Sequence, residues 1–280
     1  MKAEWAVYPV SVLCRAMEVS RSGYYEWLNG KIGKRKKENE TIKDHLLPIF
    51  EASRETYGRR RLTAALREAN LGIQPSINRV ERQMKIIDIA GYVPKATKRT
   101  TIPNPSLEDS PNLTKDASCK GVEDIWVSDI TYIRTRYGWL YLCTVMDLFS
   151  RRIVGWSLKE NMKVDLVLEA FKMAHNQRTT KKVTLFHSDK GGQYKAKKLR
   201  RRLKRLGYKQ SMTGKDHCFD NAHAESLFST LKRELIRGKI FESHEQARSA
   251  IFEYVEVYYN RIRLHSALGY KSPEGFEESA

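Results

Sequence analysis

Residues 124–136 read DIWVSDITYIRTR, and two runs of similar character follow, WLYLCTVMDLFS at 139–150 and RRIVGWSL at 151–158. All three runs are rich in β-branched and aromatic residues. A Tyr-Gly pair at 137–138 and a polar Ser-Arg-Arg at 150–152 separate them. Apolar runs bounded by turn residues in this way are typical of β-strands. We therefore predict three consecutive strands in this part of the chain.

The sequence beyond these runs changes between helical and strand patterns. KVDLVLEAFKMAHNQ at 163–177 carries apolar residues at helical spacing, and VTLFHSD at 183–189 reads as a short strand. Two more helical stretches follow, a very basic one at 195–209 and DNAHAESLFSTLKREL at 220–235. Strands followed by a helix, a strand and further helices predict an α/β domain with a mixed sheet.

The sequence before the strands is helical. YGRRRLTAALREA at 57–69 and SINRVERQM at 76–84 each place apolar residues on one face, and Ser76 is suited to cap the second helix. The polar face of that second helix is basic and includes Arg79 and Arg82. Two short helices joined by a turn fit a helix-turn-helix that reads a major groove, although an ordinary helical hairpin with solvated charges fits the spacing equally well.

Composition shifts give the expected domain boundaries. We expect an N-terminal helical segment at 1–50 and a helix-turn-helix-like domain at 51–95. The basic cluster at 34–37 reads as a solvated linker inside the first segment. Residues 96–122 are rich in Pro, Ser, Thr and Asn and read as a linker. The remaining residues, 123–280, form the α/β domain with a C-terminal helical extension.

The chain is strongly basic. Its 280 residues contain 51 Lys and Arg against 33 Asp and Glu, which gives a formal net charge of +18. Such an excess indicates a polyanionic partner, most often a nucleic acid. The four widely spaced cysteines fit neither a zinc site nor a disulfide framework, and no stretch reads as a signal peptide or membrane span. We expect a cytoplasmic protein with no membrane partner.

Three acidic residues stand out by their positions. Asp129 lies within the first predicted strand, Asp189 follows a later strand, and Glu225 lies early on a helix. Each also has an ordinary structural interpretation, as a strand-end residue, a turn former or a helix-dipole carboxylate. Gathered in one pocket, three carboxylates would repel unless hard cations such as Mg²⁺ or Mn²⁺ neutralised them. Two such ions support phosphodiester chemistry.

The motifs around these acids resemble those of the OrfB-type insertion-sequence transposases, in the DDE transposase and retroviral integrase superfamily. The resemblance covers nearly the whole chain and rests on WVSDITY, HSDKGGQY, DNAHAESLFSTLKRE and the C-terminal YNRIRLHSALGYKSPEGF, with 35 residues between Asp189 and Glu225. It implies an RNase H-like integrase catalytic core, preceded by a small all-α helix-turn-helix domain.

The resemblance also implies roles for individual residues. It makes Asp129, Asp189 and Glu225 the catalytic triad that holds two Mg²⁺ or Mn²⁺ ions. Lys232, seven residues after Glu225, would share its helix face and reach a DNA phosphate. Asn221 and His187 fall on motif positions and are candidate DNA contacts, although His187 could equally be a packed strand histidine.

A dense basic stretch flanks the second carboxylate. Fourteen Lys and Arg residues lie between Arg178 and Lys215, with Asp189 the single acid among them. A solvated charged helix is the ordinary interpretation, but like charges at this density favour neutralisation by phosphates. The candidate contacts here are Lys190, Lys197, Lys198 and Arg201.

The sequence thus predicts a DNA transposase that cleaves insertion-sequence ends and joins them to target DNA. We expect it to bind terminal repeats and target DNA as a homo-oligomer, associated with the bacterial nucleoid and possibly with an upstream-frame (OrfA-type) protein. Two alternatives are a domesticated, non-catalytic DNA-binding regulator and an RNase H-like nuclease. An intact triad argues against the regulator, and the nuclease does not explain the helix-turn-helix or the C-terminal motif.

Overall fold

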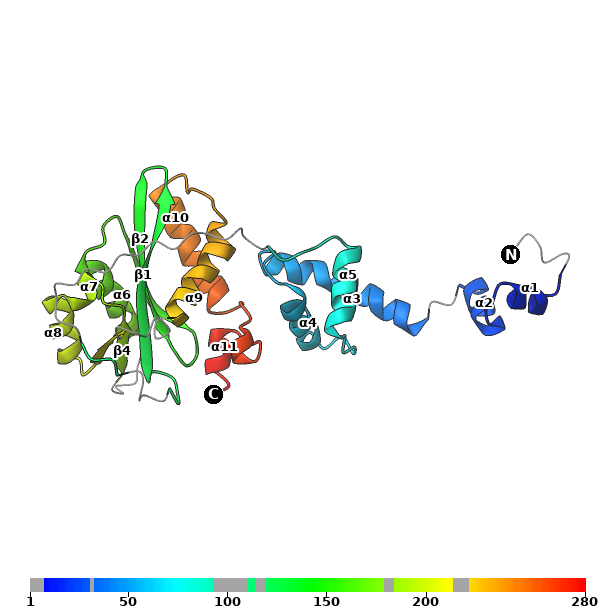
Figure 1. Ribbon diagram of the computed structural model, residues 1–280, viewed down its shortest axis with the longest axis horizontal. Coiled ribbons are helices and arrows are strands. Elements are labelled where there is room, and N and C mark those ends of the chain that lie inside the picture. Colours follow the sequence, from blue (N-terminus) through cyan, green and yellow to red (C-terminus); the bar gives the residue numbers. More distant parts are fainter. Residues whose placement is uncertain (1–7, 31–32, 93–109, 114–118, 179–183, 214–221) are drawn as a thin grey trace. The chain divides into compact units, whose positions relative to one another are not determined.

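The computed structural model describes residues 8–30, 33–92, 110–113, 119–178, 184–213 and 222–280. The chain divides into two compact units, Met1–Gly91 and Tyr92–Ala280 (Figure 1). Most of the predicted linker, 96–122, lies outside the described residues. Among the helices that are described, none combines the length and apolar character needed to cross a membrane.

The first unit is helical. Its helices are α1 (Val10–Ala16), α2 (Arg21–Leu28), α3 (Lys34–Ala52), α4 (Arg59–Glu68) and α5 (Ile77–Ile86). The apolar stripes expected on α4 and α5 are buried, with Leu62, Leu66 and Val80 fully enclosed, and both helices pack against α3. Ser76 caps α5 as predicted, since its Oγ accepts a hydrogen bond from the Arg79 N–H at 3.3 Å.

The start of this helical unit differs from the sequence expectation. The basic cluster at 34–37, expected as a linker, forms the first turn of α3. The same helix continues to Ala52, so the expected boundary at residues 50–51 falls inside it. Ile42, Leu46 and Phe50 of α3 are buried, which makes this helix part of the same core as α4 and α5. The N-terminal half of α3 is highly charged, so a domain boundary drawn from composition misses the apolar stripe of this helix.

The second unit is built on a five-stranded mixed sheet, which confirms the predicted fold class. Its strands are β1 (Ile125–Thr135), β2 (Gly138–Asp147), β3 (Ile153–Lys159), β4 (Leu185–Ser188) and β5 (Lys209–Met212), in the order β3-β2-β1-β4-β5. β1, β2 and β3 pair antiparallel, whereas β4 runs parallel to β1, and β5 runs parallel to β4. The short strand β5 was not anticipated from the sequence.

Helices cover both faces of this sheet (Figure 1). One face packs against α6 (Val164–Gln177), α7 (Gly192–Lys195) and α8 (Lys197–Arg205), around buried residues such as Trp126, Phe171 and Leu199. The other face packs against residues of α9 (Ala222–Leu231), α10 (His244–Phe252) and the π-helix η3 (Glu253–Tyr259). A second π-helix, η2 (Lys232–Ile236), continues α9, and η4 (Ser266–Leu268) and α11 (Pro273–Glu277) end the chain.

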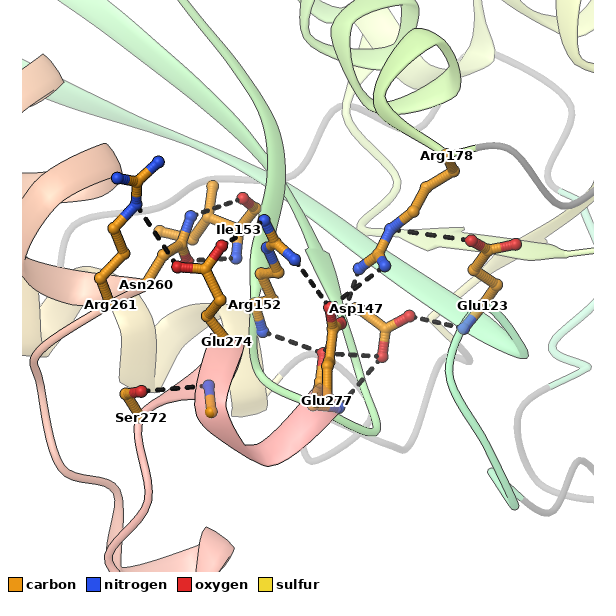
Figure 2. Close-up of polar contacts among 12 residues, drawn as sticks. Glu123, Asp147, Arg152, Ile153, Arg178, Asn260, Arg261, Ser272, Glu274 and Glu277 are labelled. Atoms are coloured by element: carbon orange, nitrogen blue, oxygen red, sulfur yellow. Dashed lines mark hydrogen bonds and ion pairs between the residues drawn. The ribbon is translucent and has the colours of Figure 1, made fainter. Parts of the chain in front are cut away.

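The C-terminal segment is fastened to the sheet by polar groups (Figure 2). The Asn260 side chain donates to the Ile153 carbonyl at 3.0 Å and accepts from the Ile153 N–H at 2.9 Å, so it continues the hydrogen bonding of β3. The Glu277 carboxylate accepts from Arg178 at 2.6 Å and from Arg152 at 2.9 Å. Although burial opposes ionisation, these donors hold the pKa of Glu277 below its ordinary value.

A buried ion pair fixes the helices beneath that segment. Arg263 forms a two-pronged contact with Glu234, from Nε at 2.7 Å and from Nη2 at 2.8 Å. The Tyr254 hydroxyl donates to the same carboxylate at 2.9 Å. Such a pair needs all its hydrogen bonds to offset the cost of removing both charges from water. The C-terminal motif therefore joins η2, η3 and the tail of the chain.

A close approach of β3 to α6 makes Gly155 indispensable. A Cβ atom at this position would lie 2.6 Å from the Ala174 nitrogen and closer still to the Ala170 carbonyl oxygen. We expect Gly155→Ala to force α6 away from the sheet and to lower the free energy of unfolding by about 3 kcal/mol. Urea unfolding followed by circular dichroism measures the effect.

The matched control is Gly121→Ala in the same unit, where the nearest atom to an added Cβ is 3.9 Å away. It should unfold at the urea concentration of the wild type. Equal stability of the two variants would contradict this account of Gly155.

Candidate active site

Strand pairing brings two of the predicted carboxylates together. β1 and β4 run parallel, and Ser128 of β1 is in register with Ser188 of β4. Asp129 is the next residue of β1, and Asp189 directly follows the end of β4, so the two acids lie side by side at the point where β4 ends.

Local backbone groups orient both carboxylates. Asp129 Oδ1 accepts a hydrogen bond from the Ile130 N–H at 2.8 Å. Asp189 Oδ1 accepts from the Gly191 N–H at 3.0 Å, which ties the acid to the glycine turn that follows it. Both side chains are half-buried. Each acid therefore has a fixed position and is partly withdrawn from water.

The electrostatics of this pair oppose full ionisation. Burial, followed by the nearby charge of Asp189, raises the pKa of Asp129 from 3.8 to about 7, and the charge of Glu225 adds to that effect. The Ile130 N–H and the Lys232 ammonium oppose the rise. Burial also raises the pKa of Asp189, against the Gly191 N–H and Lys195. Like charges held this close favour either a shared proton or a neutralising cation.

Glu225 lies in the first turn of α9 and is exposed. Ala224, Leu227 and Leu231 of the same helix are buried against the sheet face that carries Val127. This packing turns the helix so that the charge of Glu225 acts on Asp129. Within the described residues, however, no three His, Cys, Asp or Glu side chains lie close enough to hold a metal ion. The structure thus pairs the aspartates and directs Glu225 towards them without assembling a closed ligand set.

Lys232 also acts on the same site, but the helix that leads from Glu225 to Lys232 is not a regular α-helix throughout. The α-helix ends at Leu231, and Lys232 begins the π-helix η2. Its Nζ lies 4.8 Å from the ring centroid of Tyr132, and its charge lowers the pKa of Asp129. A π-turn at this point is a local change of pitch of the kind often found at functional sites.

A buried polar contact beneath the site was missed by the sequence reasoning. The Tyr194 hydroxyl lies 3.0 Å from Ser128 Oγ, and Ser128 Oγ lies 3.6 Å from Cys143 Sγ. This contact joins α7, which follows Asp189, to the strand that carries Asp129. The tyrosine closes the HSDKGGQY motif, so its place in that motif was the available signal.

Two of the candidate DNA-contacting side chains already have hydrogen-bond partners within the protein. His187 is fully buried, and its Nδ1 lies 2.9 Å from Ser211 Oγ on β5, which is the packed strand histidine left open above. Arg79 is 17% exposed and bonds Glu38 and Asn39 of α3, both at 2.8 Å. Both side chains would have to leave these partners to contact DNA. Asn221 lies outside the described residues.

The other basic candidates lie at the surface. Arg82 on α5 and Lys197, Lys198 and Arg201 on α8 are exposed, whereas Lys190 is half-buried. Leu199 and Leu203 anchor α8 in the core, as its sequence predicts. A groove of about 740 Å³ opens between α6 and α8. Its lining contains six cationic and two acidic side chains: Lys159, Lys172, Lys198, Arg201, Arg202, Arg205, Asp165 and Glu169.

Comparison with known proteins decides the family. Residues 120–218 and 225–280 match two families described as integrase core domain, and residues 37–97 match one described as HTH-like domain. Transposase InsF of insertion sequence IS3A from Escherichia coli K12 is 36% identical over 275 residues, covering 97% of this chain and 95% of its own. The chain belongs to this family of insertion-sequence transposases.

The chain is also similar to other known proteins. An uncharacterised 31 kDa protein of insertion element IS600 from Shigella sonnei is 36% identical over 267 residues, covering 95% of this chain and 97% of its own. Among solved structures, the simian T-cell lymphotropic virus intasome aligns with a TM-score of 0.47 at 14% identity, covering 80% of this chain and 72% of that chain. The HTLV-2 integrase catalytic core with magnesium aligns at 0.42 and 14% identity, covering 57% and 99%.

Membership confirms the resemblance derived from the sequence motifs, and with it the function of a DNA transposase and an integrase-type catalytic core. The matched HTH-like range begins at residue 37, inside α3. This agrees with a DNA-binding unit that starts before residue 51. The individual roles of the acids and cations are not decided by membership alone.

In the absence of a metal ion, the free energy of unfolding depends on pH through the ionisation of Asp129. The folded chain holds the proton of Asp129 more tightly than the unfolded chain. Its contribution to stability is therefore complete below about pH 4 and is lost as the pH rises through about 7. In EDTA, we expect Asp129→Asn to raise the melting temperature of the transposase by several degrees near pH 8, with little change near pH 4. Thermal unfolding by circular dichroism measures both.

Asp165→Asn is the control, because a hydrogen bond from Lys198 lowers the pKa of this surface acid. It should give no stabilisation near pH 8. An Asp129→Asn protein that melts below the wild type near pH 8 would contradict the raised pKa.

Proposed function

We propose that this transposase cleaves and joins DNA with Asp129, Asp189 and Glu225 as its catalytic carboxylates. The observation that carries the proposal is the register of β1 and β4, which sets the two aspartates side by side. The charges of Glu225 and Lys232 both act on Asp129, which supports their assignment to the same site. Family membership supplies the type of reaction.

The donor set fits a hard divalent cation. All three groups are carboxylates, and the raised pKa of Asp129 reflects repulsion that a bound cation would relieve. We propose that the triad holds two Mg²⁺ or Mn²⁺ ions. When bound, such ions supply positive charge that activates an attacking oxygen and stabilises a leaving one. The backbone N–H groups of Ile130 and Gly191 keep both aspartates oriented for that task.

The reaction has two steps at one site. In the first, a water oxygen attacks a phosphodiester at the element end, and the P–O3′ bond breaks to leave a free 3′-hydroxyl. In the second, that hydroxyl attacks a phosphate of the target DNA, and a target P–O3′ bond breaks. Lys232, on the same side as Asp129, would hold a non-bridging phosphate oxygen in both steps.

The groove between α6 and α8 is our candidate DNA surface. Two of its cations are paired within the protein: Lys198 contacts Asp165 at 2.6 Å, and Lys159 contacts Glu169 at 2.5 Å. The arginines at 201, 202 and 205 line the same groove and leave its net charge positive. Phosphates binding there would release counterions, so the affinity should depend strongly on salt.

The helix-turn-helix unit would read the terminal repeats. Asn78, Arg82 and Lys85 of α5 are exposed and can approach a groove edge, whereas Arg79 fixes α5 to α3. Two element ends must be processed together, so we propose a homo-oligomer on DNA, associated with the bacterial nucleoid. An upstream-frame (OrfA-type) protein is a further proposed partner.

Removal of one carboxylate tests the mechanism. We expect Glu225→Gln to lower strand transfer of a labelled element-end oligonucleotide, with Mg²⁺, by at least ~10³-fold, because the substitution removes a negative charge and preserves shape. Gel analysis of joined products measures it, and affinity for the oligonucleotide should be retained.

Glu253→Gln, an exposed acid on η3 outside the site, is the matched control and should join DNA normally. Joining that survives Glu225→Gln would remove the proposed mechanism. Specific binding by the wild type with no cleavage under any metal would instead favour a non-catalytic regulator.

The groove predicts a particular salt dependence. Replacing both Arg201 and Arg205 by Gln should flatten the slope of log affinity against log salt by about 2, because each lost phosphate contact contributes about 0.9. Lys204→Gln on the same helix, outside the groove lining, is the control and should leave the slope close to the wild-type value. Fluorescence anisotropy over a salt series measures all three proteins. An unchanged slope in the double variant would exclude the groove as a DNA-binding surface.

A further inference from the structure

Two of the exposed aromatic rings on the hairpin of β1 and β2, those of Tyr132 and Trp139, lie against each other. Tyr132 is 45% exposed and Trp139 is 46% exposed. Their ring centroids lie 5.2 Å apart with the ring planes at 86°. The pairing of Tyr132 with Tyr141 and of Arg134 with Trp139 makes the two rings diagonal neighbours on one sheet face.

Each of these rings lies beside a cation. Lys232 Nζ is 4.8 Å from the Tyr132 ring centroid, and the Arg134 guanidinium carbon is 5.8 Å from that of Trp139. A cation near an aromatic face gains from the negative charge of the π-system. The four side chains therefore form one surface cluster in the order Lys232, Tyr132, Trp139, Arg134, which we call the aromatic platform.

The platform is unlike the rest of its sheet face. Nearer the start of β1, Trp126 and Ser128 of the same face are buried under α6, α7 and α8. Towards the hairpin turn the rings are half open to solvent. The next residue, Leu140, points to the opposite face and is fully buried there, whereas the Trp139 ring remains 46% exposed. Exposed aromatic rings grouped with cations are typical of surfaces that bind a partner.

The platform borders the catalytic carboxylates. Tyr132 lies three residues after Asp129 on β1, so the two side chains leave opposite faces of the strand, and the link between them is Lys232. Lys232 belongs to both groups, since it contacts the Tyr132 ring and its charge acts on Asp129. Lys232 is therefore the side chain that joins the platform to the carboxylate site.

We propose that the aromatic platform binds unpaired bases of the DNA strand that enters the active site, with Lys232 and Arg134 holding the adjoining phosphates. The proposal rests on the function proposed above. Bases inside a duplex already stack on each other, so exposed rings favour bases that have left the helix. Every base has a π-face, so this binding tolerates different sequences, and each stacked base contributes about 1–3 kcal/mol. The charge of the cluster fits a polyanion.

Binding without catalysis tests the platform. In EDTA, anisotropy of a labelled single strand about 12 nucleotides long is compared with that of a blunt duplex of the same sequence. We expect Trp139→Leu to weaken single-strand binding by about 5- to 100-fold and to leave duplex binding unchanged. Trp139→Phe should retain most of the affinity, because it keeps an aromatic face.

Two controls separate stacking from general damage. Phe252→Leu removes another exposed ring, 54% exposed on α10, and should not change single-strand affinity. Tyr132→Leu is a second platform variant and should behave like Trp139→Leu. Melting temperatures equal to that of the wild type would confirm that both variants are folded. The salt slope should stay constant in the leucine variants, because no cation is removed.

Equal single-strand affinity of folded Trp139→Leu, Tyr132→Leu and the wild type would overturn the platform. Equal losses for single strand and duplex would do the same. A change only in the sedimentation of the DNA-free protein would assign the rings to contact between copies of this chain and also overturn it. Strand joining by Glu225→Gln reports on the catalytic proposal separately, so failure of one is distinguishable from failure of the other.

Discussion

Parallel pairing of β1 with β4 is the constraint on which the site depends. It places two acids that are 60 residues apart in the sequence at the same level of adjacent strands, one within β1 and the other directly after β4. Their repulsion is tolerated because the surrounding fold holds them in place: Tyr194 ties the segment after β4 to Ser128, and α9 packs against the face next to Asp129. The sheet therefore holds the two acids in an electrostatically unfavourable position, and the divalent cations that we propose would relieve it.

The chain carries a large positive net charge, whereas the pocket around Asp129 and Asp189 is acidic. The basic side chains of α8 lie outside a core anchored by Leu199 and Leu203, and they neither enter the carboxylate site nor cancel its repulsion. Lys232 is the described cation that acts on Asp129 from the opposite helix layer. A basic surface around an acidic site can bind DNA tightly, while the acidic site can still bind cations next to the reacting phosphate.

The strands and the positions of the two aspartates could be predicted because they follow from local patterns: apolar runs, turn residues, one acid within the first strand and one directly after a later strand. Other features depend on contacts that no local pattern contains. β5 is four residues long, three of them polar, and it forms because β4 offers it an edge for pairing. Arg79 looked like a groove-reading residue until α3 supplied Glu38 and Asn39 as partners. The π-turn at Lys232 likewise leaves no mark in the helical spacing.

The fastening of the C-terminal segment has a consequence for biosynthesis. Asn260 completes the hydrogen bonding of β3, and Glu277 neutralises Arg152 and Arg178. About 100 or more further residues must therefore leave the ribosome before these arginines find their counter-charge and the edge of the sheet is closed. The α/β unit of the nascent chain is therefore expected to stay incomplete until α11 has been synthesised.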